Sequence, residues 1–203
     1  MNEETLSSGF FGEDITLDIY TDLKEFYTPA NGFSRLHLCR RYGKLHILKS
    51  LQPFYSSQEF YKQLLLKEFN IGYQLDHPNI RHTLGWEKND LLGNYIVLEY
   101  IDGIPLTTFI EQGKLTQALA YKFITEICNA LQYIHSKQLI HKDLKPNNIL
   151  ITHNGNNVKL IDFGLADCDD YEILKIPAGT EKYLAPEQLN PNATLDCRTD
   201  IYS

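Results

Sequence analysis

Hydrophobic and polar residues alternate with a period of two along residues 33–51, FSRLHLCRRYGKLHILKSL, on both sides of a central YGK. This alternation predicts two strands joined by a turn. Two further strands are predicted near 80–86 and 94–100, with KNDLLG as the turn between them. By the same period, the second of these four strands places on one face Leu45, Ile47, Lys49 and Leu51.

The spacing of apolar residues becomes helical between residues 57 and 75, after a serine that is positioned to cap a helix. A second helix is predicted over TQALAYKFITEICNALQYIHSK, because its apolar residues form one stripe. The first half of the chain is therefore rich in strands, and helices dominate the second. The boundary is predicted near 99–105, EYIDGIP, where Gly103 and Pro105 interrupt the pattern. The helical stripe consists of Leu119, Phe123, Ile127, Leu131 and Ile134.

Composition describes an ordinary globular chain of 203 residues, 43% apolar and 22% charged, which is enough for one or two domains. The net charge of −7 argues against a nucleic-acid groove as the main function. No apolar run approaches the ~20 residues of a membrane span, and the N-terminus lacks the segments of a secretory signal. The cysteines lie far apart without a CxxC pair, so we expect reduced thiols and a cytoplasmic location.

Three short motifs follow one another in the second half of the chain. The polar run 141–150, HKDLKPNNIL, contains Asp143 and Asn148, which alone indicate little because loops are rich in both residue types. Asp162 begins the next motif, DFG, 19 residues after Asp143, and the last motif, APE, ends at Glu187. Motifs of this kind in this order resemble the signature set of the protein kinase family.

The resemblance extends over residues 22–203 and implies an α+β, bilobal protein kinase-like fold. The implied N-lobe is an antiparallel five-stranded sheet with one helix, and the implied C-lobe is mainly helical and incomplete. The expected parts are an N-terminal extension over 1–21, the N-lobe over 22–98, the hinge over 99–103 and a partial C-lobe over 104–203.

The resemblance also predicts an ion pair upstream of the motifs. The family holds the nucleotide phosphates with a strand lysine that is paired with a helix glutamate. Lys49 lies on the second predicted strand, and Glu68 lies in the first predicted helix, nine residues before the HPN sequence. An exposed strand lysine would be the ordinary interpretation of Lys49 alone, but Glu68 in this register favours the ion pair.

The resemblance assigns catalytic roles to residues of the motifs. Asp143 would accept or orient the proton of the substrate hydroxyl, and Asn148 and Asp162 would be oxygen ligands of Mg²⁺. Lys145 would place a positive charge beside the transferring phosphoryl group. Together with Thr180, Lys145 matches the eukaryotic-type serine/threonine kinases rather than the tyrosine kinases. A solvated lysine and a turn threonine are the alternatives for these two positions.

The ATP site is likewise implied by the resemblance. Leu98 would lie at the back of the adenine pocket, and backbone groups of Glu99 and Ile101 would hydrogen-bond the base. The residues that the resemblance assigns to the cofactor are Lys49, Glu68, Asn31, Gly32, Leu36, Ile47, Leu98, Glu99, Ile101 and Leu150.

The predicted N-lobe departs from the family at three places. Pro29, Asn31 and Ser34 stand where the phosphate-covering loop has glycines, whose backbone approaches phosphates without steric cost. Ile47 replaces an alanine that packs on adenine, and the added bulk is expected to weaken ATP affinity about five- to 150-fold. Gly72 replaces an apolar residue one turn after the paired glutamate, so we expect an empty packing position and a mobile helix.

The predicted C-lobe departs from the family as well. Lys142 stands where an arginine normally grips a loop phosphate, and lysine lacks the bidentate fork of arginine. Residues 165–178 contain no Ser or Thr but carry an acidic run, which either replaces that phosphate or is a solvated loop. The chain ends at 199–203, TDIYS, which resembles the start of the long central C-lobe helix. We therefore expect either a fragment of a longer protein or a protein that has lost the remainder, and in both cases Glu187 lacks its usual arginine partner.

Three functions stay open. The intact motifs favour ATP- and Mg²⁺-dependent phosphoryl transfer to Ser or Thr of a protein substrate. The altered loop, Ile47 and the chain end favour a pseudokinase or kinase fragment that binds nucleotide or protein without catalysis. The APE motif and Thr180 weaken a third reading, a small-molecule kinase. The expected partners are ATP, a protein substrate and a regulatory partner through the C-lobe, without nucleic acid or membrane.

Overall fold

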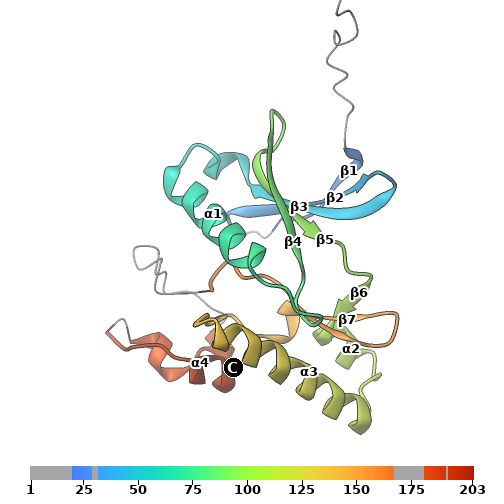
Figure 1. Cartoon of the computed structure of the whole chain (residues 1–203), viewed down its shortest axis with the longest axis vertical. Helices are drawn as coiled ribbons and strands as arrows, with labels where there is room; N and C mark the ends of the chain where they lie inside the picture. The colour runs from blue at the N-terminus through green and yellow to red at the C-terminus, as the bar shows by residue number, and fades with distance from the viewer. Residues whose placement is uncertain (1–19, 29–31, 167–180, 191) are drawn as a thin grey trace, which may run out of the picture.

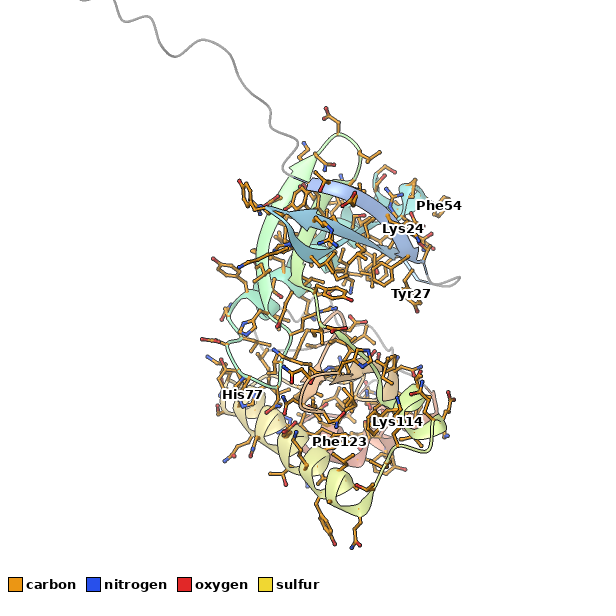
Figure 2. All side chains as sticks on the ribbon, turned by 90° about the vertical axis from the view of Figure 1, so that its right-hand side faces the viewer. Lys24, Tyr27, Phe54, His77, Lys114 and Phe123 are labelled. Atoms are coloured by element: carbon orange, nitrogen blue, oxygen red, sulfur yellow. The ribbon has the colours of Figure 1, made fainter. Side chains whose placement is uncertain are left out.

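The structure is a computed structural model that describes residues 20–28, 32–166, 181–190 and 192–203. These residues form two lobes, a sheet with one long helix above and a mainly helical part below (Figure 1). Turned by 90°, the molecule carries Lys24, Tyr27 and Phe54 on the upper lobe and Lys114 and Phe123 on the lower one (Figure 2). The predicted bilobal α+β fold is confirmed.

Five antiparallel strands form the N-lobe sheet in the order β1-β2-β3-β5-β4. β2 and β3 meet at Tyr42 and Gly43, whose φ angles of 50° and 79° suit a tight hairpin, so the predicted YGK turn is confirmed. β1 begins at Tyr20 and includes the last two residues that the sequence assigns to the N-terminal extension. The strands are β1 (Tyr20–Tyr27), β2 (Ser34–Arg41), β3 (Lys44–Leu51), β4 (Thr83–Asn89) and β5 (Gly93–Glu99).

β4 starts three residues later than the sequence pattern predicts. Residues 80–82 instead connect the two lobes, because Ile80 forms a parallel bridge with Leu160 of the C-lobe. The backbone N–H of Arg81 donates to the carbonyl of Leu160 at 2.9 Å. A strand pattern alone does not reveal which partner a residue pairs with.

The two faces of the sheet carry separate apolar clusters. One face packs against the helix α1 (Glu59–Tyr73), and the other face points away from that helix. The cluster on the helix side is built on Ile47, Leu51, Leu65, Ile96 and Leu98. The cluster on the other side is built on Cys39, Leu48, Leu92, Tyr95 and Val97. The predicted shared face of β3 is confirmed for Ile47 and Leu51, which are both buried on the helix side.

The predicted serine cap of α1 is wrong. Gln58 occupies the N-cap position and makes no capping hydrogen bond through its side chain. The hydroxyl of Ser56 instead donates to the carbonyl of Pro53 at 2.7 Å and so closes the C-terminal end of the short helix η1 (Pro53–Tyr55). The proline starts a tight turn of its own here, and that turn uses the serine before α1 begins.

Gly72 is a close-contact position, and the predicted empty space beside it is not found. A Cβ built on Gly72 would lie 2.3 Å from Oγ1 and 3.3 Å from Cβ of Thr83. The Thr83 side chain at the start of β4 therefore occupies the volume that an apolar side chain on α1 would need. Small residues at both positions let the helix and the strand approach each other.

Replacing Gly72 with alanine is expected to destabilise the protein by about 1–3 kcal/mol, because the new methyl group overpacks the contact with Thr83. Thermal unfolding should show a Tm that is about 2–12 °C lower. The double variant Gly72→Ala, Thr83→Ala should recover part of this loss. Gly85→Ala on the same strand is the matched control, because its nearest new contact would be 4.0 Å away. Equal Tm values for both single variants would contradict the proposed close contact.

The C-lobe combines a small sheet with helices, and its main helix follows the predicted stripe. Phe123, Leu131 and Ile134 are buried, and Leu119 and Ile127 pack against the same core. Glu187, for which the sequence leaves no partner, accepts a hydrogen bond from Oγ1 of Thr199 at 2.9 Å. The strands are β6 (Gly103–Pro105), β7 (Ile149–Thr152) and β8 (Val158–Leu160). The helices are α2 (Leu106–Glu111), α3 (Gln117–Ser136), η2 (Pro146–Asn148), η4 (Glu181–Tyr183), η5 (Pro186–Leu189) and α4 (Arg198–Tyr202).

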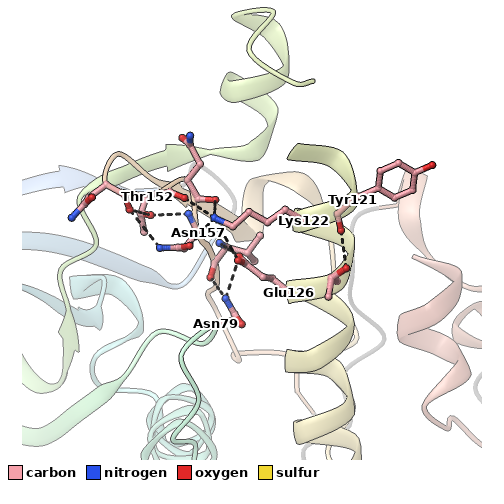
Figure 3. A network of polar contacts seen from close by, with 11 residues as sticks. Asn79, Tyr121, Lys122, Glu126, Thr152 and Asn157 are labelled. Carbon is pink, nitrogen blue, oxygen red and sulfur yellow. Dashed lines mark hydrogen bonds and ion pairs between the residues drawn. The ribbon is translucent and has the colours of Figure 1, made fainter. Parts of the chain in front are cut away.

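A polar network on α3 joins the helix to β8 and to the loop before β4 (Figure 3). Glu126 accepts from the backbone N–H of Val158 at 2.6 Å and from Nδ2 of Asn79 at 3.3 Å. Nδ2 of Asn79 also donates to the carbonyl of Val158 at 2.9 Å. Lys122 donates to Oδ1 of Asn157 at 2.8 Å. These bonds fix the β7–β8 hairpin, from which the chain continues to Asp162.

Within the described ranges, no helix combines the length and the apolar character that a membrane crossing would need.

Candidate active site

Lys49 lies in the middle strand of the N-lobe sheet, where its backbone pairs with Leu36 of β2 and Ile96 of β5. Its side chain shares the helix side of β3 with Ile47 and Leu51, and the residue is only 6% exposed. A buried ammonium group is stable only when an opposite charge and hydrogen bonds compensate it.

Two carboxylates from different lobes compensate Lys49. Its Nζ lies 2.6 Å from Oε1 of Glu68 on α1, so the predicted ion pair is present. The same Nζ lies 3.0 Å from Oδ1 of Asp162, two residues after β8. The fold therefore brings together three charged residues that are widely separated in the sequence.

Charge and burial act in opposite directions on these groups. The Lys49 ammonium holds the pKa of Asp162 well below its usual range. Burial works to lower the pKa of Lys49, but the Asp162 and Glu68 carboxylates outweigh it and raise that pKa. Burial raises the pKa of Glu68, and the nearby ammonium offsets this only in part. At neutral pH, Lys49 and Asp162 are therefore held as a charged pair.

Phe163 and Gly164 fix the segment that carries Asp162. Phe163 is buried, and its ring centroid lies 4.9 Å from that of His141. A Cβ on Gly164 would lie 3.1 Å from Oε2 of Glu68 and 3.2 Å from Oδ1 of Asp162. The glycine thus leaves the space in which the two carboxylates approach the chain.

Asp143, Lys145 and Asn148 form one hydrogen-bonded group in the loop that leads into β7. Nζ of Lys145 lies 2.6 Å from Oδ2 of Asp143. Nδ2 of Asn148 donates to the same Oδ2 at 2.8 Å and to the backbone carbonyl of Asp143 at 2.9 Å. Both N–H groups of this amide thus face Asp143, so the amide oxygen is the atom that can face a cation.

Asp200 on α4, which is distant along the chain but adjacent in space, holds the backbone of this loop. Its buried carboxylate accepts the N–H groups of His141 and Lys142, each at 2.9 Å, and pairs with Nε2 of His135 at 2.8 Å. Lys142 adopts a left-handed backbone with φ of 68°, and Asp162 does so with φ of 66°. Side chains with a Cβ rarely take this conformation, and such strain is concentrated at functional sites. The sequence contains no signal for the role of Asp200.

The side chains assigned to the nucleotide lie in both lobes. Leu36, Ile47 and Leu98 belong to one apolar cluster on the helix side of the sheet. Leu150 lies on β7 of the C-lobe, opposite Pro105 of β6. The structure thus groups the three N-lobe residues together and carries the fourth on a separate sheet.

Glu99 of the predicted hinge makes two contacts, one through its backbone and one through its side chain, that the sequence pattern does not indicate. The backbone N–H of Glu99 donates to the carbonyl of His82 at 3.0 Å, which leaves its own carbonyl as the group that could accept from a base. The side chain of Glu99 pairs with Lys159 of β8 at 3.2 Å, across the two lobes. Gly32 belongs to the predicted phosphate-covering loop rather than to the hinge, and its backbone carbonyl accepts from Nε2 of Gln52 at 2.7 Å. Ile101 lies at the start of the link between β5 and β6.

Three predicted features lie outside the described residues. They are Asn31 of the phosphate-covering loop, Thr180, and all but the first two residues of the acidic segment 165–178. Lys142, which the sequence associates with that segment, is 6% exposed.

A divalent cation fits the residues near Asp162 only if it brings further ligands. Among the described residues, no group of three or more His, Cys, Asp or Glu side chains could hold a metal ion. Asn148 and Asp162 offer one amide oxygen and one strongly acidic carboxylate. Mg²⁺ is commonly held by one or two carboxylates together with water and substrate phosphates, so this small donor set suits Mg²⁺ with a nucleotide.

Fold and site together define a kinase-like catalytic domain, and comparison with known proteins agrees. The family described as "Protein kinase domain" matches residues 32–203. Calcium-dependent protein kinase 5 of Plasmodium falciparum (isolate 3D7) is 40% identical over 144 residues, 68% of this chain and 25% of that protein. A probable serine/threonine-protein kinase of Clostridium perfringens is 34% identical over 169 residues, 81% of this chain and 24% of that protein.

A third relative, serine/threonine-protein kinase ppk25 of Schizosaccharomyces pombe, is 33% identical over 163 residues, 79% of this chain and 38% of that protein. The chain therefore belongs to the protein kinase domain family, and the predicted resemblance to eukaryotic-type serine/threonine kinases is confirmed. It spans between 24% and 38% of the length of these three relatives.

Proposed function

We propose that this protein is a serine/threonine protein kinase that transfers the terminal phosphoryl group of ATP to a Ser or Thr hydroxyl of a protein substrate. The observation that carries the proposal is the buried Lys49, held by Glu68 at 2.6 Å and by Asp162 at 3.0 Å. Phosphoryl transfer needs mainly positioning and charge neutralisation from the protein. A lysine oriented by one carboxylate beside a second, strongly acidic one supplies both.

Asp143 is the proposed catalytic base, which accepts or orients the proton of the substrate hydroxyl. Asn148 holds its carboxylate from one side, and Lys145 places a positive charge beside it at 2.6 Å. Lys145 would stabilise negative charge that develops on the transferring group. The assignment of Ser and Thr as acceptors rests on the named relatives and on Lys145 and Thr180 in the sequence.

The proposed cofactors are ATP and Mg²⁺. The amide oxygen of Asn148 and the carboxylate of Asp162 would hold Mg²⁺, and Lys49 would hold phosphate oxygens of ATP. When bound, the metal would neutralise charge on the phosphates. Leu36, Ile47, Leu98 and Leu150 would contact the base, and the backbone of Glu99 and Ile101 would hydrogen-bond it. Asn31 and Gly32 would cover the phosphates.

The cellular location and the binding partners of the protein are also proposed. We propose a cytoplasmic kinase without a nucleic-acid partner, in line with the net charge of −7. A regulatory partner would bind through the C-lobe. The alternative of a binding module without catalysis rests on the altered phosphate-covering loop and Ile47 in the sequence, and no further observation on the described residues favours it.

The test is thermal unfolding with and without Mg²⁺·ATP, together with phosphate transfer to a generic protein substrate. At about 100 times the dissociation constant, a bound nucleotide adds about 2.7 kcal/mol of stability. The Tm should therefore rise by about 5–11 °C. Asp162→Asn should lose most of this rise with ATP and Mg²⁺ together, and Mg²⁺ alone is the control. An unchanged Tm at saturating nucleotide, with no phosphate transferred, would refute the proposed function.

A further inference from the structure

Thr28 directly follows β1 and is exposed to solvent. Its neighbour Tyr27 is exposed as well and lies at the rim of the N-lobe (Figure 2). The hydroxyl of Thr28 donates to Oε1 of Glu25 on β1 at 2.7 Å. An accessible hydroxyl group is therefore held beside a carboxylate at the end of this strand.

Two basic side chains of β2 face the same carboxylate. Glu25 pairs in register with His37, and its Oε2 lies 3.4 Å from Nε2 of that histidine. Oε2 also lies 3.5 Å from Nη1 of Arg35. Both distances are longer than the roughly 2.7–2.9 Å of a charge-assisted hydrogen bond. The carboxylate thus lies between two bases and binds neither of them tightly.

Both bases also carry buried nitrogen atoms that lack a partner. Nε of Arg35 and Nδ1 of His37 have no hydrogen bond in the described part of the chain, and neither has Oγ of Ser50. Ser50 on β3 lies directly opposite Arg35. By the two-residue period, the three side chains share the face of the sheet that carries Cys39 and Leu48. Three of the four such atoms among the described residues gather at this place.

The cluster is short of acceptor oxygen atoms. An arginine carries several N–H donors, and a histidine ring and a serine hydroxyl each add a donor. Glu25 supplies two oxygen atoms, of which one already accepts from Thr28. Buried donors without acceptors are costly. A phosphate group would bring strong acceptor oxygens and a charge of about −1.5 to −2 to these bases.

We propose that Thr28 is a phosphorylation site and that Arg35 and His37 hold its phosphate. One carboxylate separates the hydroxyl from both bases, so a phosphate on Thr28 would stand where that carboxylate lies. The side chain of Glu25 is 45% exposed and can turn to solvent, which avoids repulsion between the two negative groups. A guanidinium suits this role because it binds phosphate through parallel hydrogen bonds. The phosphate would fasten the end of β1 to β2.

The transfer step rests on the proposed function, with ATP as the phosphoryl donor and a second copy of this chain as the enzyme. Oγ1 of Thr28 forms a bond to the terminal phosphorus of ATP, the bond from this phosphorus to the bridging oxygen breaks, and ADP leaves. The hydroxyl proton passes to Asp143 of the copy that acts as the enzyme. The binding of the finished phosphate depends on the folded N-lobe alone.

Mass spectrometry tests the transfer. Wild-type protein and Mg²⁺·ATP are mixed with an Asp143→Asn chain of different mass, which serves only as the acceptor. We expect phosphate on Thr28 of the acceptor and none at that position of an acceptor with Thr28→Val. Phosphate on a generic protein substrate without phosphate on Thr28 would overturn the proposal. If neither is phosphorylated, the proposed function fails and the transfer step with it, and the next experiment still decides whether the cluster holds a phosphate.

Thermal unfolding of nucleotide-free protein tests the binding of the phosphate. The chain made with phosphothreonine at position 28 should have a Tm about 2–8 °C higher than the unmodified chain. In the Arg35→Gln background, this rise should fall to less than half. Arg40→Gln is the matched control, because that arginine of β2 has a side chain that is 48% exposed and pairs with Asp22 instead. No rise in the Tm, or an equal rise with Arg35→Gln, would refute the role of Arg35.

A measurement without any substitution covers the case in which Arg35→Gln does not fold. The second pKa of a phosphothreonine is about 6, and nearby bases favour the doubly charged form. The ³¹P resonance of the folded, phosphorylated chain should therefore titrate at a lower pH than that of the same chain unfolded in urea. Identical titration curves would show that the phosphate stays in solvent and would overturn the proposal.

Discussion

Replacing Asp143 with asparagine is expected to lower the rate of phosphoryl transfer by about 10²–10⁴-fold, the usual contribution of a positioned base. An asparagine side chain cannot accept the proton of the substrate hydroxyl. The fold should persist, because a side-chain oxygen at this position can still accept from Asn148, which donates at 2.8 Å. The measurement is the initial rate of phosphate transfer to a protein substrate at saturating Mg²⁺·ATP.

The control for this variant makes the same chemical change at a solvent-exposed site. Asp102→Asn fits, since 76% of that side chain is exposed and its contact with His153 is as long as 3.9 Å. We expect wild-type transfer from this variant. Asp143→Asn should also retain the rise in Tm with Mg²⁺·ATP, which would locate the defect in the chemical step. Wild-type rates from Asp143→Asn would remove Asp143 from the mechanism.

Replacing Asp200 with asparagine is expected to impair both stability and activity. Its carboxylate accepts two backbone N–H groups, from His141 and Lys142, and pairs with His135. An amide offers one acceptor oxygen, so a buried N–H group would lose its partner and face an N–H group instead. With 1% exposure at Asp200, the expected cost is about 2–5 kcal/mol.

The loss of activity should exceed what unfolding explains. The strained backbone of Lys142 would relax without Asp200, and the neighbouring Asp143 would move with it. A displacement of about 1 Å can cost about 10²-fold in rate. Thermal unfolding and transfer rates, both measured well below the Tm of the variant, test this. Asp76→Asn is the control, with a side chain that is 94% exposed. A variant of Asp200 with normal rates would show that the loop holds its shape without it.

Local periodicity and motif spacing predict several strands and helices of this protein and the ion pair of Lys49. The two-residue alternation over 33–51 predicts β2 and β3, and the helical stripe predicts α3, because each pattern reflects which side chains face the core. The register of Lys49 and Glu68 predicts their ion pair. The predicted serine cap of α1 is wrong, because a preceding proline starts a separate turn that uses the serine. The sequence does not show which of two neighbouring turns a capping residue serves.

Contacts between distant segments are what the sequence could not predict. The empty position expected at Gly72 is filled by Thr83, eleven residues away and on another element. Residues 80–82 are predicted to begin a strand, but the bridge between Ile80 and Leu160 ties them to the C-lobe instead. Both outcomes depend on which surfaces of the folded chain meet.

The sequence by itself determined the family and the order of the main N-lobe strands and long helices, and it predicts the reactive side chains, because these depend on local pattern and on residue types at short spacing. Only the tertiary structure decided how the charges balance. Lys49 meets Asp162 as well as Glu68, Asp200 holds the loop that carries Asp143, and Lys159 pairs with Glu99 across the lobes. Electrostatic energy depends on the distance between charges and on their burial, and neither quantity can be predicted from the order of residues along the chain.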